Sequence, residues 1–198
     1  MQYARYNRLR GNDRMNYYIS DPHFDHARII MFCSRPYENV EQMNQSIIDK
    51  WNARVTKDDH AYILGDICMS VSGFVKYLQM LNGVKHIILG NHDPKNIEKQ
   101  KIPGVFFHDL IHRVKEGGDS VILCHYPIHE WPNYYRGAYH FYGHVHGTRL
   151  SHHEKAFEVC CDVLNFEPKT FKEIISMEKP TKILNESPHL PEDQPMPD

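Results

Sequence analysis

The stretch "HIILGNHD", residues 86–93, decides the fold of this chain. Its apolar run predicts a buried strand, and Gly90 allows the backbone to turn sharply where that strand ends. Asn91, His92 and Asp93 follow at once, and these residue types bind metals and move protons. A strand with polar residues at its C-terminal end is typical of an α/β protein whose site lies along one sheet edge.

The same pattern occurs at three other places. An apolar run leads into polar residues in "YYISDPH" (17–23), in "AYILGD" (61–66) and in "SVILCHYP" (120–127). Each run has the length and the aromatic or β-branched content of a short strand. Four strands that all end in polar residues predict one shared site.

Two helices are predicted between these strands. Asn39 with Gln42 three positions later forms a capping-box pattern, and an apolar stripe at helical spacing follows over 40–55. A second stripe over 71–78 is stopped by the Asn82-Gly83 pair. Strands that alternate with helices predict an α/β fold.

The chain is long enough for one domain. We expect a flexible extension over 1–14, the domain over 15–184 and a disordered proline-rich tail over 185–198. Within the domain, a late strand region is predicted over 156–166 and a closing helix over 169–177.

Composition excludes several classes of protein. The 198 residues are 41% hydrophobic with a net charge of −2, so no basic excess indicates general nucleic-acid binding. No apolar run is long enough to span a membrane, so no membrane partner is expected. The 5 cysteines form no C-x-x-C pair, which favours a reduced, cytoplasmic compartment. The 15 histidines are the unusual feature, since histidine is the commonest metal ligand.

Five clusters of metal-ligand residues stand in order along the chain. In an extended segment residues two apart point to one face, so D-x-H and H-x-H each present two ligands together. Two divalent cations roughly 3.5–4 Å apart, which activate water and clamp a phosphate ester, would account for them all. The clusters are Asp21-Pro-His23, Gly65-Asp66, Gly90-Asn91-His92-Asp93, His125 and Gly143-His144-Val-His146.

These clusters resemble the ordered motifs of the calcineurin-like metallophosphoesterase superfamily. They stand here as "SDPHFDH", "LGDI", "LGNHD", "CHYP" and "GHVHG", and the resemblance covers roughly residues 15 to 178. The segment "VCCDVLNFEPKTFKEI" is also similar to the end of small bacterial and phage members. The resemblance implies a four-layer α/β/β/α sandwich with two mixed β-sheets and a dimetal site at the C-terminal ends of the strands.

The resemblance also implies roles for single residues. His92 would be the acid or the substrate-orienting group, supported by Asp93. Two divalent ions would be the cofactors, with Mn²⁺ foremost and Fe, Ni, Zn or Mg as other candidates. The first ion would be held by Asp21, His23 and His146, the second by Asn91, His125 and His144, with Asp66 bridging both.

Four further residues are candidate substrate contacts. His26 follows the first motif, where it would touch substrate or hold the loop. Arg35 suits an oxyanion, although an ordinary surface charge explains it as well. Tyr126 and Arg136 lie in the aromatic segment 126–143, which would stack on a nucleobase or form a hydrophobic flap.

The resulting hypothesis is hydrolysis of a phosphodiester, with nucleotide-like substrates favoured by the aromatic segment. The resemblance implies attack by a metal-bridging hydroxide. A phosphomonoesterase or a nuclease would use the same site, with nucleic acid as a substrate only. A non-enzymatic scaffold in protein assembly, as in the retromer coat, is the opposing class, and the presence of every motif histidine argues against it. The partner is therefore a phosphate ester, and the sequence does not indicate the oligomeric state.

Overall fold

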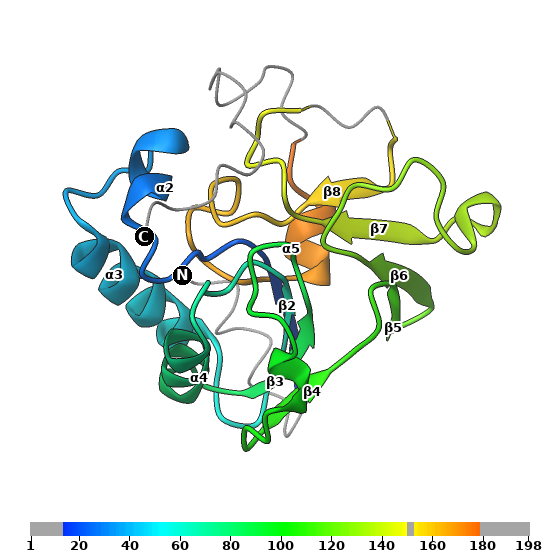
Figure 1. The fold of residues 1–198 in the computed structure, drawn as a ribbon. Coiled ribbons are helices and arrows are strands. Elements are labelled where there is room, and N and C mark those ends of the chain that lie inside the picture. The colour runs from blue at the N-terminus through cyan, green and yellow to red at the C-terminus, as the bar shows by residue number, and fades with distance from the viewer. Residues whose placement is uncertain (1–13, 150–152, 179–198) are drawn as a thin grey trace.

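The computed structural model describes residues 14–149 and 153–178, and Figure 1 shows their arrangement. The predicted tail over 185–198 lies outside the described residues. So does the predicted extension, apart from Arg14. Residues 150–152 and 179–184 of the predicted domain are outside them too.

The first sheet has five strands in the order β4-β3-β2-β1-β9. Neighbours from β1 to β4 are parallel, and β9 pairs antiparallel with β1. The parallel strands therefore bring their C-terminal ends to one edge. The strands are β1 (Asn16–Ile19), β2 (His60–Leu64), β3 (Val84–Ile88), β4 (Val105–Phe107) and β9 (Lys169–Thr170).

The second sheet has four strands in the order β5-β6-β7-β8. The pair β5–β6 is antiparallel, whereas β6–β7 and β7–β8 are parallel. Both sheets are thus mixed, as predicted. The strands are β5 (His112–Glu116), β6 (Asp119–Leu123), β7 (Tyr139–Tyr142) and β8 (Ala156–Glu158).

Helix ends follow the capping chemistry of the sequence. The Asn39 side chain accepts from the Gln42 N–H at 2.8 Å, and the Gln42 side chain accepts from Glu38 N–H, one position before the expected partner. A complete capping box joins Thr170 and Glu173. The helices are α2 (Ala27–Phe32), α3 (Val40–Arg54), α4 (Val71–Met80) and α5 (Phe171–Ile175), with 3-10 turns η2 (Ile97–Lys99) and η3 (Tyr134–Arg136).

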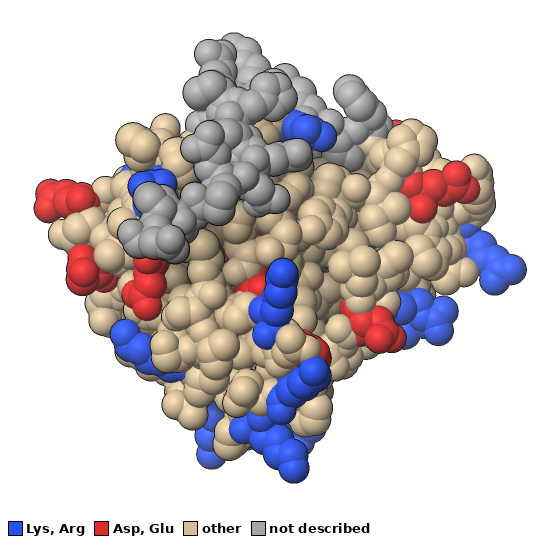
Figure 2. Space-filling view, viewed as in Figure 1, with Lys and Arg blue, Asp and Glu red and all other residues tan. Residues whose placement is uncertain are grey.

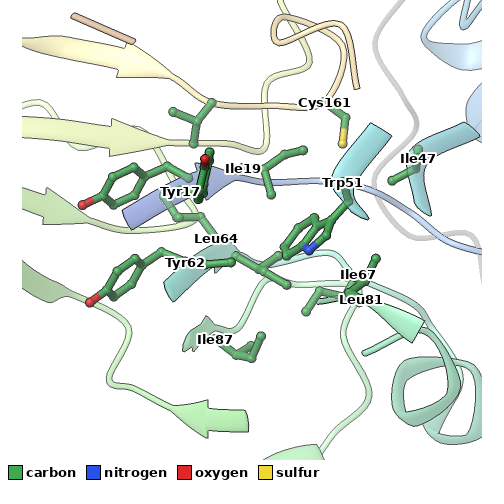
Figure 3. Packing of buried hydrophobic residues seen from close by; sticks show 14 of the residues in the cluster. Tyr17, Ile19, Ile47, Trp51, Tyr62, Leu64, Ile67, Leu81, Ile87 and Cys161 are labelled. Carbon is green, nitrogen blue, oxygen red and sulfur yellow. The ribbon is translucent and has the colours of Figure 1, made fainter. Parts of the chain in front are cut away.

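The two sheets pack face to face. Tyr18 of β1 stacks on Tyr62 of β2 at 5.3 Å between ring centroids, and it meets Phe141 of β7 edge-on at 5.1 Å. The opposite face of the first sheet is covered by helices, and Figure 3 shows Trp51 of α3 on the side of β1 that carries Ile19. Successive side chains of a strand point to opposite faces of the sheet. One set therefore packs between the two sheets, and the other packs against the helices.

The outer face of the second sheet is covered differently. Trp131 and Ala138 pack there on Ile122 and Tyr142, in a small separate cluster. These two residues belong to the connection between β6 and β7, in which η3 is the one helical turn. The four-layer sandwich is therefore not confirmed, because the described residues supply a helical layer on one side only.

The late segment 156–166 was expected to be strand, and only β8 is. A single β-bridge pairs Ser20 with Cys160, and turns follow. Ser20 N–H donates to the Val159 carbonyl at 2.8 Å, and Cys161 N–H donates to the Ser20 carbonyl at 2.9 Å. This bridge joins the two sheets directly beside Asp21, so strand pairing stops where the ligand residues begin.

None of the helices in the described ranges is long and apolar enough to cross a membrane. On the face shown in Figure 2, acidic and basic side chains both lie among uncharged ones.

Candidate metal centre

Five loops bring the predicted ligands together at the C-terminal ends of the strands. His23 Nε2 and His125 Nε2 lie 3.6 and 3.5 Å from Asp66 Oδ2. His146 Nε2 and His23 Nε2 lie 3.8 and 3.9 Å from Asp21 Oδ1. Ligand bonds of about 2.0–2.2 Å place two atoms on one ion roughly 3–4 Å apart. These separations therefore suit shared cations.

Two buried ligand atoms have no hydrogen-bond partner. They are Asp21 Oδ1 and His23 Nε2. A buried polar atom without a partner costs roughly 1–3 kcal/mol, so native structures rarely leave two side by side. Asp21, His23 and Asp66 form one group of potential ligands, and Asp66, His125 and His144 form another. Asp66 is common to both, so the two groups surround one shared carboxylate and could hold a metal ion.

The backbone is strained at the predicted ligands. A positive φ is uncommon outside glycine and costs roughly 1–3 kcal/mol where the surroundings impose it. Such conformations persist when the surrounding structure holds them, and they are common at binding and catalytic sites. The residues are Asp21 (φ 56°), His23 (51°), Asp66 (54°), His144 (73°) and His146 (47°).

Two motif glycines permit close approach of the carboxylates. A Cβ on Gly90 would lie 2.2 Å from Asp66 Oδ1, and a Cβ on Gly143 would lie 2.2 Å from Asp21 Oδ2. Both distances are far below van der Waals contact. Glycine is therefore required at these positions by the carboxylate on the neighbouring loop.

The electrostatics of the centre favour cations. Burial, and next the nearby Asp21 carboxylate, raise the pKa of Asp66 to about 7. Burial and neighbouring imidazoles lower the pKa of His23 well below its ordinary value, so its ring is neutral. Two adjacent carboxylates and a neutral imidazole form a site that a cation would stabilise.

The other predicted ligands are held by specific hydrogen bonds. His125 Nδ1 lies 2.8 Å from the Leu64 carbonyl, and its Nε2 lies 3.0 Å from Asn91 Oδ1. His144 donates its backbone N–H to Asp21 Oδ2 at 3.0 Å, and its ring meets that of His125 edge-on. The structure thus brings all seven predicted ligands into one site.

His92 lies at the exposed rim of this site. Its ring centroid is 5.6 Å from that of His23, and its backbone N–H donates to Asp66 Oδ1 at 2.9 Å. The Asp93 carboxylate accepts from the N–H groups of Asp66, Ile67 and Gly90 at 2.7–2.9 Å. The hydrogen bonds of Asp93 therefore connect the turn that carries Asp66 with the turn that carries His92.

Two of the predicted substrate contacts lie at the site. His26 Nδ1 is 3.4 Å from His23 Nδ1. The Tyr126 ring meets those of His125 and His144 edge-on at 4.9 and 4.8 Å, and 37% of the residue is exposed. A bound substrate could reach both side chains.

The two arginines are placed differently. Arg35 is only 4% exposed, and its guanidinium donates to protein groups on all sides. It therefore faces into the protein, away from any substrate. Arg136 is exposed on η3, and among the described residues no hydrogen bond or ring contact joins it to the seven predicted ligands.

Asp162 is a site residue that the motifs do not indicate. Its Oδ2 lies 2.8 Å from His146 Nδ1 and 3.1 Å from Cys160 Sγ. Burial alone would raise the pKa of Asp162, but the hydrogen bond from His146 and the charge of Arg35 hold it well below the ordinary value. A polar residue directly after an apolar "VCC" run was the one available signal.

No family model matches this chain. The chain is 31% identical to "Uncharacterized protein MJ1445" from Methanocaldococcus jannaschii over 180 residues, which are 86% of this chain and 95% of the archaeal protein. The chain belongs to the MJ1445 family. "Gene 66 protein" of Mycobacterium phage L5 is 32% identical over 130 residues, 56% of this chain and 62% of the phage protein.

Among solved structures, the protein of unknown function AQ665 from Aquifex aeolicus has a similar fold. The TM-score is 0.63 with 20% sequence identity, over 81% of this chain and 97% of that chain. At this identity the likeness concerns the fold alone. This chain therefore shares its fold with the Aquifex aeolicus protein.

Proposed function

We propose that this protein is a metal-dependent phosphoesterase that hydrolyses a phosphodiester on two divalent ions. One observation carries the proposal: buried Asp21 Oδ1 and His23 Nε2 have no hydrogen-bond partner and lie beside Asp66. The resemblance of the five motifs to the calcineurin-like metallophosphoesterase superfamily supports the same conclusion. The strained ligand backbones support it independently, because strain gathers at functional sites.

The resemblance assigns the ligand residues to two ions, and the separations between their atoms support this assignment. Asp21, His23 and His146 would hold the first and Asn91, His125 and His144 the second, with Asp66 shared. When bound, such ions supply Lewis acidity that lowers the pKa of water and offsets charge on phosphate oxygens. Imidazole-rich sites suit borderline transition metals, so Mn²⁺ or a similar ion is preferred to Mg²⁺.

His92 is the proposed proton donor to the leaving alkoxide. Its exposure at the rim leaves the ring accessible to a bound ester. Its backbone is held by the Asp66 carboxylate, and Asp93 holds the adjoining turn. A positioned imidazole of this kind contributes typically 10²–10⁴-fold to such reactions.

Tyr126 supports a substrate with a flat group, such as a nucleotide-like diester. Its ring lies against His125 and His144 and is partly open to solvent. A nucleobase could stack there while the phosphate faces the ligand residues, and such stacking contributes roughly 1–3 kcal/mol. His26 lies beside His23, where it could contact the phosphate.

The test combines metal content with turnover. We expect elemental analysis to find two ions per chain after reconstitution with Mn²⁺. EDTA should abolish hydrolysis of bis(p-nitrophenyl) phosphate, and Mn²⁺ should restore it better than Mg²⁺. Parallel assays with p-nitrophenyl phosphate separate diester from monoester preference. Undiminished turnover in protein shown to be free of metal would contradict the proposal.

A further inference from the structure

The Arg35 guanidinium joins two separate loops of the candidate centre. Its Nε and Nη2 donate to the two carboxylate oxygens of Asp162, each at 2.9 Å. Nη2 also donates to the Asp21 carbonyl at 2.8 Å, and Nη1 donates to the Pro22 carbonyl at 2.9 Å. Arg35 thus binds the loop after β1 and the turn after β8 at the same time.

Asp162 extends this contact to a ligand imidazole. Its Oδ2 accepts from His146 Nδ1 at 2.8 Å, which leaves Nε2 directed at Asp21 Oδ1, 3.8 Å away. A carboxylate behind a ligand histidine fixes both the ring orientation and the nitrogen that faces the ion. In the buried Arg35–Asp162 pair, Asp162 therefore orients the His146 ring, and Arg35 holds the backbone of Asp21.

Stability alone does not account for this pair. Both side chains are nearly inaccessible, at 0% exposed for Arg35 and 6% for Asp162. Desolvation of two charges offsets most of their attraction, and apolar residues of similar volume often serve the fold equally well. The strained φ of Asp21, 56°, and of His146, 47°, must also be held by surrounding groups.

We infer that Arg35 and Asp162 form a clamp that positions Asp21 and His146 for the first metal ion before it binds. The inference rests on the proposed function, since it concerns ligands of the proposed centre. Neither clamp residue has a hydrogen bond to Asn91, His125 or His144 among the described residues. The clamp therefore contacts ligands of the first ion directly, and it reaches the second ion's ligands only through the backbone N–H of His144 on Asp21.

The principal test is calorimetric titration with Mn²⁺ of the wild-type chain and of the double variant Arg35→Met/Asp162→Leu. The apolar replacement leaves no unpaired buried charge, so the fold is retained. We expect one of two binding steps to weaken roughly 10–100-fold, the range for loss of a partner behind a metal ligand. The other step should stay within about threefold. Arg35→Lys should weaken the same step, because lysine keeps the charge but cannot bridge three acceptor groups.

Asp59→Asn is the matched control. Asp59 is another buried carboxylate, and it accepts from the N–H groups of Met15 and Thr56 at the far end of β2. Its loss should lower the melting temperature without changing either binding step. Equal weakening of both steps in the double variant, or no weakening of either, would overturn the clamp.

A second readout needs no metal. In crystal structures of the metal-free proteins, the His146 ring should leave its position opposite Asp21 in the double variant while His125 keeps its own. An unmoved His146 would reject the clamp. If the wild-type chain binds no ion at all, the proposed function is contradicted. This result differs from an unmoved His146 in the double variant, which contradicts only the clamp.

Discussion

Two histidine-rich regions of this molecule differ in what their nitrogens face. In the candidate metal centre, imidazoles converge on the carboxylates of Asp21 and Asp66. Between the two sheets, nearer the N-terminal ends of β2 and β5, four other histidines face one another instead. We call these four the histidine row: His60, His86, His108 and His112.

Within the histidine row, both nitrogens of His86 face other imidazoles. His60 Nδ1 lies 2.8 Å from His86 Nε2, and His86 Nδ1 lies 2.8 Å from His108 Nε2. The His112 ring stacks on that of His108 at 3.9 Å between centroids. None of the four has a positive φ. The potential ligand groups of the described residues all lie in or beside the candidate metal centre, and none includes the row.

This difference shows that the number of histidines does not identify a metal centre. Carboxylate oxygens within 4.0 Å of ring nitrogens, buried atoms without partners and strained backbone distinguish the centre from the row, whose charged neighbour is the exposed Asp109. Both regions hold neutral imidazoles: burial first, and then the adjacent rings, lower the pKa of His86 to about 4. Neutral rings such as His23 and His86 therefore occur in both regions, and the surroundings of the rings separate the two.

The largest effect is expected from a substitution that removes metal binding at the candidate centre and leaves the histidine row unchanged. Asp66→Ala removes the one carboxylate common to both ligand groups. We expect loss of both ions, and a fall in activity greater than the roughly 10–100-fold caused by loss of an outer partner. Elemental analysis and diester assays check this. His86→Phe is the control and should keep two ions per chain; two ions in Asp66→Ala would contradict the assignment.

The next effect separates His92 from the ligand histidines. His92→Asn should keep both ions but lose roughly 10²–10⁴-fold in rate on an alkyl diester. With p-nitrophenolate as the leaving group the loss should be much smaller, because that anion needs no proton. His125→Ala should fail on both esters. Equal losses on both esters with His92→Asn would make His92 a substrate-orienting group.

A smaller effect tests the close approach inside the centre. Gly143→Ala places a Cβ 2.2 Å from Asp21 Oδ2, so we expect overpacking to cost about 1–3 kcal/mol in the free energy of unfolding. Gly118→Ala is the matched change, since nothing lies within 4 Å of its Cβ. Denaturant unfolding of both variants checks this. Equal stability of the two would show that the loops after β1 and β7 can separate without cost.

The smallest effect concerns the pH dependence of the histidine row. The pKa of His86 in the folded state, about 4, is below the ordinary 6.5. The unfolded chain therefore binds more protons between these values, and stability falls as the pH drops from 6.5 to 4. Unfolding curves of His86→Phe in EDTA should show a shallower fall, by about 1 kcal/mol after a discount for solvent screening. Identical slopes would mean that the row does not contribute.

The sequence by itself determined several of the strands and helices and the candidate ligands of this protein. Apolar runs that lead into polar residues mark β1, β2, β3 and β6, with a glycine at the turn after β2 and β3, because strand burial and the turn after it are local properties. The cap residue Asn39 marks the start of α3 for the same reason. Parallel pairing then brings the strand ends to one edge.

Only the tertiary structure decided which side chains support the ligands. Arg35 meets Asp162 across 127 positions of sequence, and His60 meets His86 on a neighbouring strand. The cover of the second sheet by Trp131 and the turns after Cys160 were likewise not predicted. Such contacts depend on how the two sheets are joined, as at the Ser20–Cys160 bridge, and no local periodicity encodes that junction.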